Sequence, residues 1–253
     1  MPSPATAPPL VSCLCVTHDR VPMLRHAVAC FLQQTWTASE LVVLHEDRDR
    51  ATAAYLATLA EPRIRPVAVP ALPRLSLGAK RNRSVAEARG SHIAVWDDDD
   101  WHGPERLERQ MAVLAGSSAV ACTLRRLTVY DAATGTALLS YPRQWENTLV
   151  ARKDALPPYA DLDRGEDTAC VKQLAQQNRI AWTDSPELYI YHCHGRNSFG
   201  RAHFRRRVFL GSQVLDTACA ARAQGLLASL EATPLAAAEL RLAQAAPPPF
   251  LRP

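Results

Sequence analysis

The sequence lacks several features that mark well-known classes of protein. Its 7 cysteines are odd in number and scattered, no C-x-x-C pair occurs and no signal peptide begins the chain, so we expect a reduced, cytoplasmic protein. No apolar run reaches the roughly 18 residues that span a bilayer, so we expect any membrane contact to be peripheral, at the inner membrane face. Without a zinc finger, an RNP aromatic pattern or a strongly basic domain, nucleic-acid binding is not indicated.

Lysine is also scarce and occurs only at Lys80, Lys153 and Lys172. The positive charge is therefore almost all arginine, which favours bidentate contacts with phosphate. The net charge of +4 is compatible with an anionic substrate or a membrane surface. The hydrophobic fraction of 47% is enough for a substantial core, and 253 residues have room for one large domain or two small ones.

Strand-like and helix-like segments alternate in the first half of the chain. Short apolar runs occur at 10–17, 40–45, 64–70 and 92–96, and helical spacing occurs at 21–34, 50–60, 76–90 and 103–116. This alternation predicts an α/β fold, with a mostly parallel sheet flanked by helices and an edge-like strand at 64–70.

After about residue 117 the pattern changes. The later predicted elements are a hairpin at 119–141 with its turn at 131–135, a strand at 147–155, a helix at 166–177, a strand at 187–194 and a helical segment at 201–232. We expect a disordered tail at 1–9, a single domain over 10–224, and a C-terminal helix with a Pro-rich tail over 225–253.

Four consecutive aspartates, Asp97–Asp100, directly follow the predicted strand at 92–96. In open α/β sheets, ligands bind beyond the carboxyl ends of the strands. Hard oxygen ligands select Mg²⁺ or Mn²⁺, which is typically shared between one or two carboxylates and substrate phosphates. The alternative is an acidic turn in which Asp100 caps the next helix.

Several stretches carry a family resemblance. The segments 11–36, "ELVVLHED" (40–47), 75–107 and "RGEDT" (164–168) follow in order. Together they resemble family 2 glycosyltransferases with the GT-A fold, a Rossmann-like fold, over roughly residues 10–200. The resemblance implies an inverting transfer from a nucleotide-diphosphate sugar, most simply a UDP-sugar, with Mn²⁺ or Mg²⁺ as cofactor. It also implies a nucleotide-sugar-binding half over 10–116 and an acceptor-binding half over 117–224, which would take a glycan, lipid-linked or small-molecule acceptor.

The resemblance also assigns residues to the donor. Thr17 and Glu46 or Asp47 would line the base and ribose pocket, although His45 stands where the family usually has a carboxylate. The alternative for these positions is ordinary loop chemistry. Further donor-binding residues implied by position are Gly78, Arg81, Asp97 and Asp98. For Lys80 and Arg83 the favoured interpretation is a solvated helix face.

For the metal, the resemblance implies Asp99 and His194, the latter followed by Gly195 and Asn197 as in similar enzymes. Asp100 is interpreted as a structural cap. Trp101 could shield the sugar or pack on the core. His192, Cys193 and His194 suggest zinc, yet no partner pair of ligands lies at finger spacing, and adjacent residues in a strand point to opposite faces.

Glu166 and Asp167 are the candidate catalytic pair. By resemblance Asp167 is the base that takes the acceptor proton, and Glu166 helps to position the acceptor. Local sequence supports a second interpretation equally, in which the two acids favour the start of the helix at 166–177. The two roles are compatible because a helix start is a good place to hold a base.

The helix Arg201–Arg207 sets four arginines beside the apolar stripe of Phe204, Val208 and Leu215. It could meet diphosphates, an anionic acceptor or a membrane surface, or be a solvated face with snorkelling arginines. Two other functions stay open for the whole chain. One is a non-catalytic sugar-nucleotide or glycan binding subunit. The other is a nucleotidyltransferase, which would need a Gly-rich loop after the first strand, where "THDRVP" stands.

Overall fold

The structure, a computed structural model, describes residues 7–229. Through residue 95 the elements follow the predicted alternation of strand and helix. They are β1 (Val11–Val16), α1 (Val21–Leu32), β2 (Ser39–Glu46), α2 (Arg50–Ala57), β3 (Ile64–Val69), α3 (Leu77–Glu87) and β4 (His92–Val95). The pairs β1–β2, β1–β4 and β2–β3 are all parallel, and β3 lies at an edge, as predicted.

The later elements are less regular. They are β5 (Trp101–His102), α4 (Arg106–Ala115), β6 (Ala121–Leu124), β7 (Thr128–Asp131), β8 (Thr136–Leu139), β9 (Val150–Arg152), α5 (Glu166–Gln176), β10 (Ile180–Thr183), β11 (Tyr189–Cys193), α6 (Arg201–Phe204), β12 (Gln213–Val214) and α7 (Thr217–Ser229). Short 3-10 turns lie at Glu146–Thr148, Lys153–Ala155 and Pro186–Leu188, and a π-helical turn at Arg205–Phe209.

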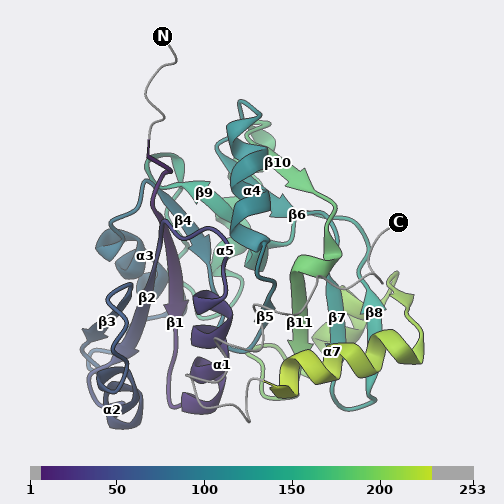
Figure 1. Cartoon of the computed structure of the whole chain (residues 1–253), viewed down its shortest axis with the longest axis horizontal. Helices are drawn as coiled ribbons and strands as arrows, with labels where there is room; N and C mark the ends of the chain where they lie inside the picture. Colours follow the sequence, from purple (N-terminus) through teal and green to yellow (C-terminus); the bar gives the residue numbers. More distant parts are fainter. Residues whose placement is uncertain (1–6, 230–253) are drawn as a thin grey trace.

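These strands form two sheets (Figure 1). The larger has the order β10-β6-β9-β4-β1-β2-β3, and the smaller has the order β12-β8-β7-β11-β5. The larger sheet is parallel except at β9, which runs antiparallel to both β4 and β6. Three strands from the second half of the chain therefore complete the sheet that the first half begins, so the two predicted halves share one sheet.

The predicted hairpin at 119–141 is only half right. β7 and β8 pair with a turn after Asp131, as predicted, but β6 belongs to the larger sheet. The chain leaves that sheet after Leu124, whose N–H donates to Thr148 Oγ1, and the Arg125 N–H donates to the Thr183 carbonyl. The pattern of apolar and polar residues did not indicate this change of sheet, because β6 and β7 are both fully buried and therefore look alike in sequence.

The continuous helix predicted at 201–232 is also wrong. α6 and the π-helical turn end at Phe209, Gly211 takes a left-handed φ of +84°, and β12 pairs antiparallel with β8 before α7 begins at Thr217. The C-terminal helix thus begins at 217 rather than 225. The predicted tails fall mainly on residues 1–6 and 230–253, which lie outside the described residues.

The helices cover both faces of the larger sheet. Alternate residues of β1 contribute to different apolar clusters, Cys13 and Cys15 to one and Leu14 to the other. The first cluster includes residues of α1, α2, α4 and α7, and the second includes residues of α5. The first also contains Tyr130 and Ala137 of the smaller sheet, so a single core joins the two sheets. Within residues 7–229, no helix is long and apolar enough to cross a membrane.

Replacing Leu41 by Ala tests the core. Leu41 is 0% exposed on β2 and lies in the first apolar cluster. The truncation should lower the free energy of unfolding by about 2–5 kcal/mol, since it removes buried methyl groups and leaves a cavity. Urea denaturation measures this change. Leu210→Ala is the matched control, because Leu210 is 73% exposed and its loss should cost less than about 0.5 kcal/mol. Equal losses in both variants would contradict this description of the core.

Candidate active site

Asp97 and Asp98, the first two of the four aspartates after β4, have separate partners. Arg81 Nη2 donates to Asp97 Oδ1 at 2.9 Å, and Thr17 Oγ1 donates to Asp98 Oδ2 at 2.6 Å. Burial raises the pKa of Asp97, although the Arg81 guanidinium opposes the rise. Burial and the neighbouring charge of Asp99 raise the pKa of Asp98 to about 7. Thr17, Arg81, Asp97 and Asp98 are therefore brought together, as predicted, at the carboxyl ends of β1 and β4.

Asp99 lies against two cationic or donor groups. His194 Nε2 is 3.1 Å from Asp99 Oδ2, and Arg20 Nη1 is 3.2 Å from the same oxygen. Burial alone would raise the pKa of Asp99, but the hydrogen bond and charge of His194, together with Arg20, outweigh it and lower that pKa. Asp99 is thus the carboxylate of the run that the site holds most firmly ionised, and the predicted pair of Asp99 and His194 is in contact.

Asp100 is structural, as predicted, but it does not cap the following helix. α4 begins at Arg106, and the residue before it makes no side-chain cap hydrogen bond. Asp100 is fully buried and accepts from Tyr189 Oη at 2.6 Å and from the His192 N–H at 2.8 Å. Burial raises the pKa of Asp100 well above its ordinary value. The reason for the difference is tertiary, since β5 pairs with β11 and places Asp100 over that strand.

His194 belongs to a short loop after β11. Gly195 has φ of +82°, a left-handed value that lets the chain turn back, and the Arg196 N–H donates to His194 Nδ1 at 3.2 Å. With Nδ1 as acceptor, Nε2 carries the proton that the ring donates to Asp99. The neighbouring Cys193 is buried in the third apolar cluster. Among residues 7–229 no group of three or more His, Cys, Asp or Glu is arranged to hold a metal ion.

Glu46 lies at the end of β2 beside a lysine. Lys80 Nζ donates to Glu46 Oε1 at 2.6 Å, and this bond lowers the pKa of Glu46. The Lys80 side chain is only 11% exposed, so the interpretation of Lys80 as a solvated residue is wrong. Arg83 on the same helix is 56% exposed and pairs with Glu87, as expected for a solvated face. The sequence did not indicate that Lys80 is paired, because its partner Glu46 lies on β2, far from Lys80 in the sequence.

The remaining residues after β2 have distinct roles. The buried His45 ring contacts the Glu46 carbonyl through Nδ1 at 2.9 Å. Asp47 is exposed, and its Oδ1 accepts from the Ala71 N–H at 3.1 Å. Sequence reasoning missed Asp49, which caps α2 at Thr52 and accepts from the Asp19 N–H at 2.8 Å. The spacing of an acid three residues before a helical threonine could have indicated this cap.

At Gly78 the absence of a side chain allows a close backbone approach, and the group that approaches is the backbone of this chain at Ala160 and Leu162. A Cβ at Gly78 would lie 1.7 Å from the Ala160 carbonyl oxygen, and the Gly78 N–H donates to the Leu162 carbonyl at 2.9 Å. Asn82, one turn further on α3, exchanges two 2.9 Å hydrogen bonds with the backbone of Tyr159. α3 therefore holds the segment that leads into α5, and a role of Gly78 toward a ligand stays a prediction.

Glu166 and Asp167 form the first turn of α5, where Gly165 precedes them with φ of +69° and no side chain caps the helix. Glu166 is buried, and its Oε1 accepts from Arg81 Nε at 2.7 Å. Asp167 is half-buried. The pKa of Asp167 is raised to about 7, mainly by burial. The charge of Arg81 opposes this rise, and the charge of Glu166 adds to it. The same guanidinium contacts Asp97, so Glu166 of the candidate catalytic pair lies at the aspartate cluster.

For Arg205–Arg207 the structure agrees with the second of the two interpretations, a solvated face beside a packed apolar stripe. Phe204 and Val208 are buried in the third apolar cluster, so the predicted stripe packs inward and is not free to meet lipid. Arg201 makes a bidentate pair with Asp131 at 2.8 and 2.7 Å. Arg205–Arg207 are exposed. Trp101 is also buried in the core, which agrees with the packing alternative.

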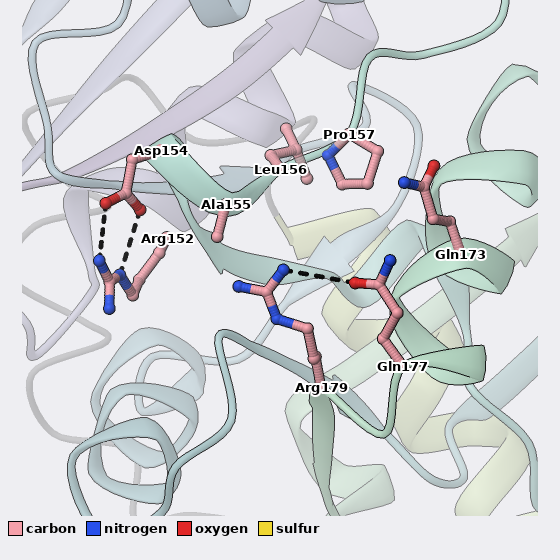
Figure 2. A pocket seen from close by; sticks show the side chains of 8 residues that line it. All are labelled: Arg152, Asp154, Ala155, Leu156, Pro157, Gln173, Gln177 and Arg179. Carbon is pink, nitrogen blue, oxygen red and sulfur yellow. Dashed lines mark hydrogen bonds and ion pairs between the residues drawn. The ribbon is translucent and has the colours of Figure 1, made fainter.

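A shallow cavity of about 330 Å³ lies elsewhere (Figure 2). None of the candidate residues lines it. Arg152, one of its residues, pairs across the sheet with His92 at the beginning of β4, so this cavity lies at the sheet edge opposite the aspartates. Its lining residues are Arg152, Asp154, Ala155, Leu156, Pro157, Gln173, Gln177 and Arg179.

Known proteins resemble this chain in sequence. The model of the family described as Glycosyl transferase family 2 matches residues 12–158. The succinoglycan biosynthesis protein ExoO of Rhizobium meliloti (strain 1021) is 31% identical over 103 residues, which are 41% of this chain and 29% of that protein. The chain thus spans less than a third of this curated relative.

Solved structures resemble it in fold. S. aureus TarS 1–349 in complex with UDP-GlcNAc has a TM-score of 0.61 at 14% identity, covering 90% of this chain and 69% of that one. The complex of TarS 1–349 with UDP has a TM-score of 0.55 at 15% identity, covering 73% and 60%. Another TarS structure has a TM-score of 0.57 at 15% identity, covering 72% of this chain and 36% of its own. At such identities the likeness shows the fold alone, and it confirms the predicted GT-A type of α/β architecture.

Arg81→Gln tests the shared guanidinium. The change leaves the buried Glu166 without its cation and should lower the free energy of unfolding by about 3–5 kcal/mol, as for one partner removed from a buried pair. Chemical denaturation followed by circular dichroism measures it. Arg83→Gln is the control, since that arginine is exposed and its pair is worth less than about 0.5 kcal/mol. An Arg81 variant as stable as the Arg83 variant would show that the pair contributes little.

Proposed function

Because this chain belongs to glycosyl transferase family 2, we propose that it moves a sugar from a nucleotide-diphosphate sugar to an acceptor hydroxyl, with inversion at the anomeric carbon. The observation that carries the proposal is the contact of Arg81 with both Asp97 and Glu166. This contact puts an acidic cluster suited to a donor beside Glu166, which directly precedes Asp167, the carboxylate proposed as the base. The family supports the reaction class, and the geometry supports the division of roles.

For the donor we propose a UDP-sugar bound at the carboxyl ends of β1, β2 and β4. Two of the similar structures hold UDP and UDP-GlcNAc, which supports this donor class. Thr17, Asp98 and Arg81 lie together at that edge, and Glu46 ends β2 next to β1. In this proposal Asp97 and Asp98 accept from ribose hydroxyls, and Glu46 or Asp47 accepts from the base.

The residues present fit a divalent cation. Asp99, with its lowered pKa, offers a hard oxygen, and His194 offers a nitrogen once Nδ1 rather than Nε2 carries the proton. Carboxylate and water oxygens suit Mn²⁺ and Mg²⁺, and Mg²⁺ at such sites keeps few protein ligands. Phosphate oxygens and water would complete the coordination. When bound, the cation would stabilise the negative charge that grows on the departing diphosphate.

Asp167 is the proposed base. A carboxylate can take the proton of an attacking hydroxyl when its pKa is close to the working pH, and the pKa of Asp167 is about 7. A base on the opposite side of the sugar from the leaving group directs an in-line displacement, which inverts the anomeric carbon. Glu166 is held by Arg81 and would position the acceptor.

The acceptor is proposed to be a glycan, a lipid-linked glycan or a small molecule with a free hydroxyl. The name of the relative ExoO, a succinoglycan biosynthesis protein, supports a glycan. A membrane contact through the Arg201–Arg207 segment would have to use the exposed Arg205–Arg207 together with Leu210 and Val214, which are 73% and 64% exposed. The helix face itself is packed against the core.

The alternative of a non-catalytic binding subunit makes a different prediction from catalysis. A binder would show no turnover in any form, whereas it would still bind nucleotide. The nucleotidyltransferase alternative is less well supported, since the loop after β1 has no run of glycines to hold a triphosphate. Assays of UDP-sugar hydrolysis and transfer with Mn²⁺ distinguish all three.

Asp167→Asn should lower kcat by about 10²–10⁴-fold, the usual contribution of a general base, while UDP affinity changes little. In the wild type, kcat/KM should rise as the pH passes through about 7, because the base must lose its proton, and then level off. Steady-state assays between pH 5.5 and about 9 measure both. Asp154→Asn is the control, because Asp154 is exposed at the opposite edge of the sheet. Its kcat and its pH dependence should match those of the wild type. Full activity of Asp167→Asn would remove this residue as the base.

Removal of metal gives a separate test. EDTA should stop turnover, and Mn²⁺ or Mg²⁺ should restore it. Asp99→Ala should lower turnover by more than about 100-fold, as expected for loss of a group that stabilises charge in the transition state, and should not recover at raised Mn²⁺. Assays with each cation, with Asp154→Ala as control, check this. Turnover that persists in EDTA would contradict the metal requirement.

A further inference from the structure

Arg20 is an unassigned residue at the centre of the site. It lies between β1 and α1, and its Nη1 is shared between two carboxylates, 3.4 Å from Asp98 Oδ1 and 3.2 Å from Asp99 Oδ2. Its Nη2 donates to the Arg196 carbonyl at 3.1 Å. One guanidinium thus joins the aspartate cluster to the loop that carries His194.

The contacts of Arg20 are looser than those of Arg81. Charge-assisted N–H···O bonds are usually about 2.7–2.9 Å long, and those of Arg81 are 2.7 and 2.9 Å, with 10% of its side chain exposed. The contacts of Arg20 are all 3.1 Å or longer, and its side chain is 32% exposed. Arg81 is therefore a fixed countercharge, whereas Arg20 can leave the cluster at small cost.

We propose that Arg20 neutralises Asp98 and Asp99 until a divalent cation replaces it, and that its guanidinium then binds the diphosphate of the donor. This inference rests on the proposed function. A cation on Asp99 Oδ2 would be close to Arg20 Nη1, which contacts the same oxygen, and like charges at such distances repel. Arginine matches phosphate geometry well, so a diphosphate on the cation offers the displaced side chain a new partner.

The loop of His194 gives a second reason for this coupling. While Arg20 holds the Arg196 carbonyl, the Arg196 N–H donates to His194 Nδ1, and Nε2 donates its proton to Asp99. Binding of a cation through Nε2 needs the proton on Nδ1 instead, and therefore needs the Arg196 N–H to move away. Release of Arg196 by Arg20 removes one of the bonds that hold this loop, while Asn197 still joins His192 and His194. Arg20 thus opposes binding of the cation alone and favours binding of cation and diphosphate together.

Removal of the guanidinium should separate these two effects. In Arg20→Met, the affinity for Mn²⁺ alone, measured by electron paramagnetic resonance of free Mn²⁺, should rise about tenfold because a competing charge is gone. The affinity for UDP in the presence of Mn²⁺, measured by calorimetry, should fall about tenfold. Arg20→Lys, which keeps the charge, should hold Mn²⁺ affinity near the wild-type value and recover only part of the UDP affinity.

Arg25→Met is the matched control. Arg25 is exposed on α1 and lies over the Tyr55 ring, so this variant changes the net charge equally without touching the cluster, and it should bind Mn²⁺ and UDP as the wild type does. Unchanged or weaker binding of Mn²⁺ by Arg20→Met, with normal thermal unfolding, would overturn the proposal, as would unchanged UDP affinity. If the wild type itself shows no Mn²⁺-dependent UDP binding, the proposed donor and metal fail as well, and this outcome is distinguishable because it needs no variant.

Discussion

Two carboxylates from distant parts of the chain, the half-buried Asp97 and the buried Glu166, share the guanidinium of Arg81. Each charge alone in this setting would be costly, because burial disfavours an ionised group. The shared cation allows both to stay at the same edge of the sheet, and the charges of both carboxylates keep the pKa of Arg81 well above its ordinary value although burial opposes this. This triad therefore joins the ends of β4, α3 and α5.

The same constraint explains how four aspartates can follow one another. A run of like charges would repel if all faced one solvent space. Here the four side chains differ in their partners, although Asp98 and Asp99 share Arg20. Burial raises the pKa values of Asp97, Asp98 and Asp100, whereas His194 and Arg20 outweigh burial and lower the pKa of Asp99. Asp100 contributes to the framework by holding β11, and through β11 it places His194 opposite Asp99. The last of the four aspartates thus has a structural role.

A single helix, α3, supports several parts of the site. α3 provides Arg81 for the carboxylates, Lys80 for Glu46 and Asn82 for the segment before α5. Three neighbouring residues on one helix therefore fix three different parts of the edge. Arg20 differs because its contacts are long and partly exposed, which makes it the residue of this edge best suited to move when a ligand arrives.

Periodicity along the sequence was sufficient for the strands and helices up to residue 95, because buried parallel strands are short apolar runs and their helices are amphipathic. The aspartate run Asp97–Asp100 also indicated a candidate site, since ligands of open α/β sheets bind beyond the carboxyl ends of the strands, and the family resemblance added Thr17, Glu166 and Asp167. Only the tertiary structure decided that β6 and β7 belong to different sheets, that Lys80 is paired, that Asp100 supports β11 and that Arg20 lies on the cluster. Each of these depends on a partner between 30 and 100 residues away in the chain, and a local pattern contains no information on which distant group will compensate a charge.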